Sequence, residues 1–298
     1  IFVLPVDIPL VRTQTLRLLL DGFAAAPAAV LHPVFAGRHG NRVDPGAARG
    51  HPPLIAARHA AEILAWEGQN GLAGALQALE AGHGAAEVAV AARGIHFDVD
   101  TPAELAEGQR RFERRGIPTP DEAVALLALH NAGERGLAHG RGVAQAALAL
   151  AGALNARGTT LELEQELELD LELVESAALL HDIAKGSPRH EAAGAALLDG
   201  LGFGPVARIV EAHRDIPPAA AQRLSEREVV YFADKLVRGS ARVDVPTRFQ
   251  EKLDRFQDDA EATAAIRRRL RNALDMQQRI EAAAGASVAQ ILSAGDGA

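Results

Sequence analysis

Residues 177–186 read Ala177-Ala178-Leu179-Leu180-His181-Asp182-Ile183-Ala184-Lys185-Gly186, and they set an imidazole beside a carboxylate at the end of an apolar helical run. His181 follows Val174 by seven residues and Ala177 by four, which is the spacing of one helix face, so we expect its imidazole to point inward. Asp182 lies about 100° further round the same helix, close enough to share a metal ion. Lys185 is expected to project over the same patch.

Four other polar residues also fall on apolar helix faces, at helical spacing from aliphatic neighbours: His139, His190, His213 and Asp234. A single histidine on such a face is more often a hydrogen-bonded core residue than a ligand. Burying this many uncompensated polar groups is costly, whereas buried charges are tolerated when they coordinate a metal. The pattern therefore predicts a metal site between helices.

The ordered set His139, His181-Asp182, His190, His213 and Asp234 resembles the HD superfamily of metal-dependent phosphohydrolases, in its variant with two extra histidines. The resemblance covers about residues 120–285, and the ordered set is far more specific than the His-Asp pair alone. It implies an all-α domain whose helices converge on one or two divalent ions.

The chemistry of such a site gives each residue a role. Two divalent ions about 3.5–4 Å apart would acidify a water and neutralise charge on phosphoryl oxygens. We expect Asp182 to bridge them, with His139, His181 and Asp234 completing one shell, and His190 and His213 the other. Imidazole and carboxylate suit Fe, Mn or Zn without choosing among them. Lys185 would hold the substrate phosphate; the alternative is a surface lysine that closes a helix.

Composition limits the classes of function. A chain of 298 residues can form two domains. Its net charge of −8 argues against a general nucleic-acid binder, because phosphate backbones are held mainly by Lys and Arg. The absence of cysteine is compatible with a reducing cytosol, and we expect a cytoplasmic protein. The first twenty residues contain Pro5, Asp7 and Arg12, so they are neither a signal peptide nor a membrane span.

The N-terminal third alternates apolar runs with helical patterns. Asp7 is expected directly after a buried strand, at the carboxyl end where α/β sheets bind ligands. Thr101-Pro102-Ala103-Glu104 is a capping box with proline at the first helical position, so a helix should begin there. We expect strands over residues 1–6, 29–35, 88–90 and 95–99, and helices over 13–23, 56–66 and 72–81.

This third resembles the C-terminal portion of MobA-like nucleotidyltransferases, the kind that includes molybdenum cofactor cytidylyltransferases. Three segments carry the resemblance: residues 4–9 (LPVDIP), 50–55 (GHPPLI) and 98–102 (DVDTP). It implies that Asp7 and Asp100 hold Mg²⁺, with Asp98 as a helper, and that Gly50 and His51 contact the substrate. The alternative is that Asp7 merely starts a turn and Asp100 precedes a helix.

Two departures from that family affect the expected activity. The Gly-rich loop that cradles the triphosphate should precede Asp7 and is absent, and Asn41 to Arg49 resembles an insertion. Because Met276 is the single methionine, we expect that Ile1 is not a natural start and that the chain has lost part of this domain. The predicted fold is thus a truncated, Rossmann-like α/β sheet followed by an all-α HD domain, without nucleotidyl transfer by this chain.

The predicted boundaries are a partial transferase domain at residues 1–112, a linker at 113–119, the HD domain at 120–285 and a tail at 286–298. Capping boxes at Thr119 and Ser225 open two of its helices. Residues 161–173 alternate Leu with acidic residues, and we expect an acidic loop followed by the start of the motif helix. Helices are expected over 121–131, 139–155, 170–185, 190–200, 205–213, 225–238 and 248–284.

Three functions remain open from sequence alone. The first is a phosphohydrolase that acts on a phosphate ester, expected to be a nucleotide. The second is a nucleotidyltransferase in the full-length protein, acting on a molybdopterin-type cofactor with the HD domain regulatory. The third is a nucleotide sensor without turnover, which the complete set of ligands argues against.

Overall fold

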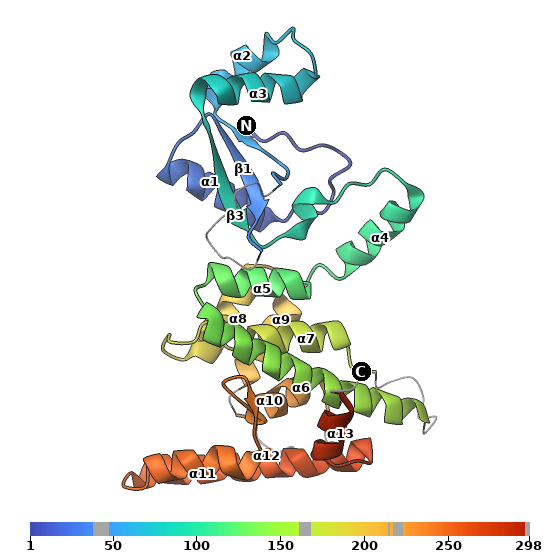
Figure 1. The fold of residues 1–298 in the computed structure, drawn as a ribbon, viewed down its shortest axis with the longest axis vertical. Coiled ribbons are helices and arrows are strands. Elements are labelled where there is room, and N and C mark those ends of the chain that lie inside the picture. Colours follow the sequence, from blue (N-terminus) through green and yellow to red (C-terminus); the bar gives the residue numbers. More distant parts are fainter. Residues whose placement is uncertain (38–47, 161–167, 214, 217–222, 296–298) are drawn as a thin grey trace. The chain divides into compact units, whose positions relative to one another are not determined.

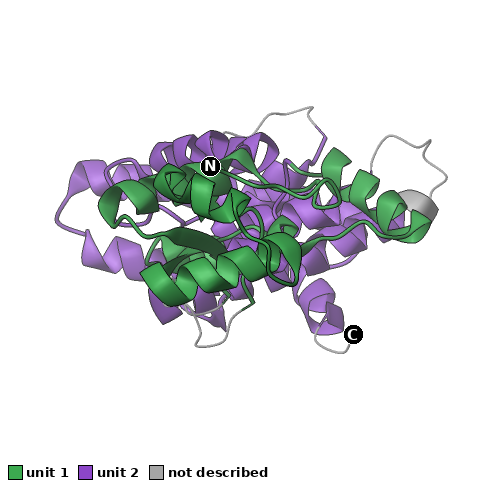
Figure 2. Cartoon of the chain, turned by 90° about the horizontal axis from the view of Figure 1, so that it is seen from above, with its two compact units in different colours: residues 1–115, 124–131 green, residues 116–123, 132–298 purple. Residues whose placement is uncertain are grey.

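The computed structural model describes residues 1–37, 48–160, 168–213, 215–216 and 223–295. Internal contacts separate two units, residues 1–115 with 124–131 and residues 116–123 with 132–298 (Figure 2). Most of the expected insertion at 41–49 and the expected acidic loop at 161–167 lie outside the described residues. The domain boundaries taken from sequence stay predictions.

The first unit is built on a three-stranded sheet in which β1 (Val30–Phe35) is central (Figure 1). β1 pairs antiparallel with β2 (Leu54–Ile55) and parallel with β3 (Ala85–Val90). Five of its six residues are buried, as expected for a central strand covered on both faces. α1 (Thr13–Ala25) packs on β1 and β3, and α3 (Gly71–His83) packs on β1. The α/β prediction for this part is confirmed.

Short elements connect the sheet to the end of this unit: η1 (Ala57–His59), α2 (Ala60–Leu64), η2 (Arg93–His96) and α4 (Pro102–Glu113). α4 begins at the predicted capping box. The Glu104 N–H donates to Thr101 Oγ1 at 3.2 Å, and the Thr101 N–H donates to Glu104 Oε2 at 2.8 Å. This reciprocal pair satisfies two backbone donors that the helix itself leaves free.

Two expected strands are not formed. In residues 1–6 the only bridge is from Phe2 to Leu54, and Val6 is fully exposed. Pro5 has no N–H to give to a ladder, and its carbonyl instead accepts from the Ile8 N–H at 3.3 Å in a turn. Burial alternates along residues 95–99 as expected, but Ile95 and His96 lie in η2 and no strand of the described residues includes this segment.

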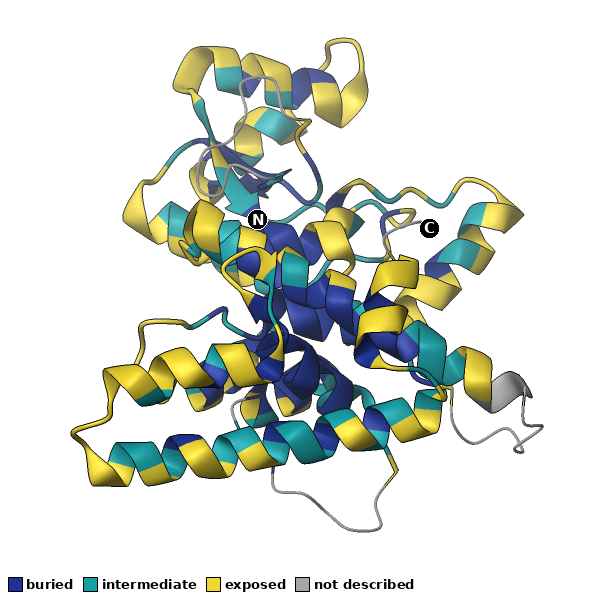
Figure 3. Cartoon of the chain, turned by 60° about the horizontal axis from the view of Figure 1, so that its bottom comes forward, coloured by how far each residue is buried: buried dark blue, intermediate teal, exposed yellow. Residues whose placement is uncertain are grey.

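The second unit is helical, and its buried residues gather at its centre, dark blue in Figure 3. Its elements are α6 (Gly133–Thr160), α7 (Leu171–Leu180), α8 (His190–Gly200), α9 (Gly204–Ala212), α10 (Glu226–Lys235), a hairpin of β4 (Val237–Arg238) and β5 (Ala241–Arg242), α11 (Val245–Arg255), α12 (Ala260–Ala284) and α13 (Val288–Gly295). α6 packs against α7, α8 against α9, and α10 against both α6 and α7. α5 (Pro120–Leu129) begins at the predicted Thr119 capping box and is shared between the two units. Apart from the hairpin, the all-α expectation is confirmed.

Two helix predictions in this unit are corrected. The single helix expected over 248–284 is two helices, α11 and α12, because Asp259 caps a new helix by accepting from the Ala262 N–H at 2.9 Å. The motif helix ends at Leu180 rather than at Lys185, with His181 as its C-cap. No described helix is long and apolar enough to cross a bilayer.

Candidate metal centre

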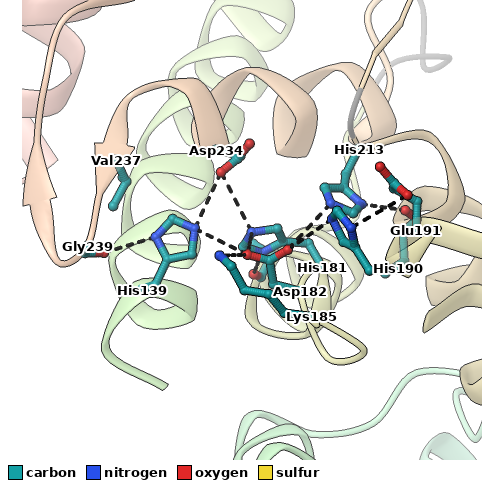
Figure 4. A network of polar contacts seen from close by, with 12 residues as sticks. His139, His181, Asp182, Lys185, His190, Glu191, His213, Asp234, Val237 and Gly239 are labelled. Carbon is teal, nitrogen blue, oxygen red and sulfur yellow. Dashed lines mark hydrogen bonds and ion pairs between the residues drawn. The ribbon is translucent and has the colours of Figure 1, made fainter. Parts of the chain in front are cut away.

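The six predicted donors come together in the second unit, mostly from helix ends (Figure 4). His139 lies on the first half of α6, and Asp234 in the last turn of α10. The other four stand at the ends of α7, α8 and α9: His181 and His213 are C-caps, Asp182 follows His181, and His190 is the first residue of α8.

Asp182 lies between two sets of imidazoles. Its Oδ2 is 3.8 Å from His139 Nε2 and 3.5 Å from His181 Nε2. Its Oδ1 is 3.5 Å from His190 Nε2 and 3.7 Å from His213 Nε2. Each side forms a group of three potential metal ligands, hereafter the first donor set (His139, His181, Asp182) and the second donor set (Asp182, His190, His213).

Asp234 extends the first donor set. Its Oδ1 lies 3.4 Å from His139 Nε2 and 3.7 Å from His181 Nε2. The first donor set with Asp234 thus offers two imidazoles and two carboxylates, and the second offers two imidazoles and the shared carboxylate. Such nitrogen and oxygen donors suit a divalent transition metal.

Backbone carbonyls fix the histidine tautomers. The Nδ1 atoms of His181 and His213 donate to the carbonyls three residues earlier, Ala178 O at 2.7 Å and Val210 O at 2.6 Å. Both carbonyls are in the last turn of a helix, where a carbonyl has free acceptor capacity. His139 Nδ1 donates to Gly239 O at 2.9 Å. Because Nδ1 of all three is engaged by a carbonyl, Nε2 is the nitrogen left to bind a metal ion.

The state of His181 fits a role as a metal ligand. His181 Nε2 is buried and has no hydrogen-bond partner among the described residues, a state that buried nitrogens rarely keep. Burial lowers the pKa of His181 to about 4, although the Asp234 and Asp182 charges oppose this. The imidazole is therefore neutral at pH 7, which is the form that binds metals.

Both carboxylates are held in the ionised form. Burial raises the pKa of Asp182, but contacts with His213, His181 and Lys185 outweigh it and leave the pKa well below its usual range. The pKa of Asp234 is also held well below its usual range: burial opposes this, and the neighbouring Lys235 and His139 dominate. The site thus carries two negative charges next to imidazole nitrogens, an arrangement that favours a cation.

Two glycines allow this geometry. Gly140 follows His139 on α6, and a Cβ there would lie 2.7 Å from Leu179 O of α7, so only glycine permits this approach of the two helices. Gly239 occupies the turn between β4 and β5 with φ of +60° and presents its carbonyl to His139.

Lys185 lies at the edge of the centre, as the sequence spacing predicts. Its Nζ is 2.5 Å from Asp182 Oδ2, and its side chain is 66% exposed. A cation so placed can contact both the bridging carboxylate and a molecule that arrives from solvent. Its role toward substrate stays a prediction.

Sequence reasoning missed two cations behind Asp234. Lys235 is buried, and its Nζ donates to Asp234 Oδ2 at 2.7 Å and to His213 O at 3.1 Å. Arg248 of α11 donates from Nη2 to Asp234 Oδ1 at 3.2 Å. A lysine directly after a buried aspartate could have indicated the first contact. Arg248 gave no signal, because α11 was expected to be part of a longer helix.

The predicted residues of the first unit form a looser arrangement. The Val99 N–H donates to Asp7 O at 2.9 Å, so the backbone joins the Asp7 segment to that of Asp98 and Asp100. All three carboxylates belong to exposed residues, and among the described residues they do not form a group of three close donors. Their role in holding Mg²⁺ stays a prediction.

Gly50 and His51 lie beside the sheet. The Gly50 N–H donates to Pro33 O at 2.8 Å, and the His51 N–H donates to Ile95 O at 2.9 Å. A Cβ at position 50 would lie 2.6 Å from the Ile95 side chain, so close packing explains this glycine. Contact of either residue with a substrate stays a prediction.

Two family models match the chain: the HD domain over residues 136–239, and the MobA-like NTP transferase domain over residues 1–85. The chain thus contains an HD domain and a MobA-like NTP transferase domain. All six donors of the metal centre fall inside the HD domain, and Asp7, Gly50 and His51 fall inside the MobA-like segment. No curated protein and no solved structure matches the chain. The HD domain indicates a metal-dependent hydrolase, and its histidine and aspartate cluster is compatible with a divalent metal site.

Proposed function

We propose that the HD domain hydrolyses a phosphate ester, expected to be a nucleotide, and that its two donor sets, which share Asp182, would each hold a divalent ion. The observation that carries this proposal is the position of Asp182, whose two oxygens face different pairs of imidazoles at 3.5–3.8 Å. Bound divalent ions supply the Lewis acidity that polarises a phosphoryl group and lowers the pKa of water. Fe, Mn and Zn all suit the donors.

The protein's own residues supply position and charge. Asp182 and Asp234 are ionised, and the Nδ1 atoms of His139 and His181 are engaged by backbone carbonyls, so the Nε2 atoms already face the site. Lys185 offers hydrogen-bond donors and no acceptor; at the exposed edge it binds a phosphoryl oxygen of the substrate. Burial of His139, His181 and His213 keeps bulk water from three of the four imidazoles.

The test combines elemental analysis with a phosphate-release screen over nucleotides and simple phosphate esters. Asp182→Asn should lose both metal ions and all phosphate release, while a His190→Ala/His213→Ala double variant should lose one ion. Asp254→Asn, an exposed residue of α11, is the matched control and should keep both properties. Full metal content and activity in Asp182→Asn would exclude the proposed site. Nucleotide binding without any phosphate release by the wild type would favour the sensor.

A second candidate is nucleotide binding by the MobA-like segment, with a molybdopterin-type cofactor as the eventual acceptor. The hydrogen bond between the Val99 N–H and Asp7 O supports it, because this bond brings the Asp7 and Asp100 segments together. Calorimetry with CTP or GTP and Mg²⁺ tests it. Asp7→Asn or Asp100→Asn should weaken binding at least tenfold, whereas Asp21→Asn, exposed on α1, should not. Equal binding by all three variants would remove the candidate.

A further inference from the structure

A second group of metal-type donors lies in the first unit, far along the chain from Asp7 and outside the HD domain. It consists of His59, Glu62 and His83. His59 ends η1, Glu62 follows one turn later in α2, and His83 is the last residue of α3. His59 Nδ1 lies 3.1 Å from Glu62 Oε2, and His83 Nε2 lies 3.5 Å from Glu62 Oε1. The two imidazole centroids are 4.5 Å apart.

One of the three donors is buried, and the other two are exposed to solvent. The His59 side chain is 8% exposed, whereas those of Glu62 and His83 are 52% and 47% exposed. Two imidazoles and one carboxylate, with a position left for water, are a donor set typical of Zn²⁺ and its neighbours in the transition series.

The helix that carries Glu62, α2, has few contacts to hold it in place. α2 has five residues and buries none of them, and Leu64 is 86% exposed. Among its side chains, Ile63 packs against the core cluster of Ala29, Val30, Ile55 and Leu79. A helix this short is not stable without outside contacts.

We propose that His59, Glu62 and His83 bind one divalent transition-metal ion of the Zn²⁺ class, which ties α2 to the C-terminal end of α3. The site is separate from the HD centre in residues and in unit. It fixes the segment that connects β2 to β3.

Arg58 contacts the buried donor, His59. Its Nε donates to His59 Nε2 at 3.1 Å, so without a metal the His59 proton is on Nδ1, toward Glu62. Metal binding at Nδ1 moves the imidazole proton to Nε2, and this breaks the contact with Arg58. Arg58 therefore opposes the metal through its charge and through the tautomer that it stabilises.

The experiment uses the full chain and measures Zn²⁺ by competition with a chromophoric chelator. Glu62→Gln and His83→Ala should each bind one Zn²⁺ equivalent fewer than the wild type. His96→Ala, an exposed histidine of the same unit that contacts Ala48 O, is the matched control and should lose none. Arg58→Gln should bind the same number of equivalents, with at least threefold higher affinity at this site.

Trp66, the single tryptophan, follows α2 directly and provides a local signal. Zn²⁺ should raise the temperature at which Trp66 fluorescence changes in the wild type, and not in Glu62→Gln. Because Gln has nearly the shape of Glu, this variant decides the matter even if His83→Ala does not fold. Equal Zn²⁺ equivalents and equal shifts in the wild type and Glu62→Gln would overturn the proposal, and so would unchanged affinity in Arg58→Gln.

Discussion

Asp182 and Asp234 each pair with a lysine, one of them exposed and the other buried. Lys185 contacts Asp182 from an exposed position, whereas Lys235 contacts Asp234 from a buried one. An exposed ammonium can move to a ligand with little loss, because water already solvates it. A buried ammonium cannot, so Lys235 is a positioning residue that orients Asp234 and also reaches the backbone of His213.

Replacing Lys235 with methionine should lower the free energy of unfolding of the metal-free protein by about 3 kcal/mol, because a buried carboxylate loses its partner. Saturating Mn²⁺ should reduce that loss, since a cation at the first donor set compensates Asp234. Urea unfolding with and without Mn²⁺ measures both values. The control is Arg255→Met, which removes an exposed cation in the last turn of α11 and should show neither effect. An equal loss with and without metal would show that no metal balances Asp234.

Lys185→Met should leave metal content unchanged and raise KM for the phosphate ester about tenfold, which corresponds to one lost charged contact. Lys185→Arg should keep most of the affinity, because a guanidinium also binds phosphate. Steady-state kinetics and elemental analysis on the same preparations measure this. An unchanged KM in the methionine variant would favour the surface-lysine interpretation.

At the scale of elements, the approach of α6 to α7 sets the distance between His139 and His181. Gly140→Ala would place a Cβ 2.7 Å from Leu179 O, so we expect the helices to separate, at a cost on the order of 1–3 kcal/mol, with weaker metal binding. Gly152→Ala is the control on the same helix: no described atom lies within 4 Å of its Cβ. It should stabilise α6 by about 0.5–1 kcal/mol. Chemical unfolding and metal titration of both variants measure this, and equal behaviour would contradict the role of Gly140.

The sequence predicted the elements whose pattern is local. Helices with an apolar face and a capping box, such as α4 and α10, begin where Thr101 and Ser225 predict. The two failed strands were short, and at residues 95–99 burial alternates as in a strand although the segment belongs to no sheet. The break between α11 and α12 is marked in the sequence by a single capping residue, Asp259, which a long helical pattern on both sides hides.

The donors of the HD centre were predictable for the same reason. Each histidine and Asp234 falls at helical spacing from apolar neighbours in its own segment, even where His181 and His213 cap their helices, so the inward direction can be worked out from one segment alone. Lys235 and Arg248 act through contacts between elements, and the group of His59, Glu62 and His83 depends on where α3 ends relative to α2. Spacing within one segment carries no information about such contacts.

At the scale of the whole molecule, each unit has its own apolar interior. In the first unit Leu19, Leu31 and Leu54 form a buried cluster, and in the second the core includes the fully buried Tyr231 and Phe232. Units with separate cores can unfold separately. The chain has one tryptophan and one tyrosine, Trp66 in the first unit and Tyr231 in the second, so each unit carries its own fluorescent residue.

Asp182→Asn should therefore lower the stability of one unit and not of the other. A metal ion at 100 times its Kd stabilises the folded state by about 2.7 kcal/mol, which for a unit of this size corresponds to roughly 5–10 °C in Tm. At the same Mn²⁺ concentration, the variant should lose that increment in tyrosine fluorescence, recorded in a Trp66→Phe background so that Tyr231 is seen alone. With Trp66 present, the wild type and Asp182→Asn should show the change in Trp66 fluorescence at the same temperature. The reason is that the lost metal stabilises only the unit that contains the HD centre. Equal shifts in both signals would contradict separate unfolding, and no shift in either would show that Asp182 binds no stabilising metal.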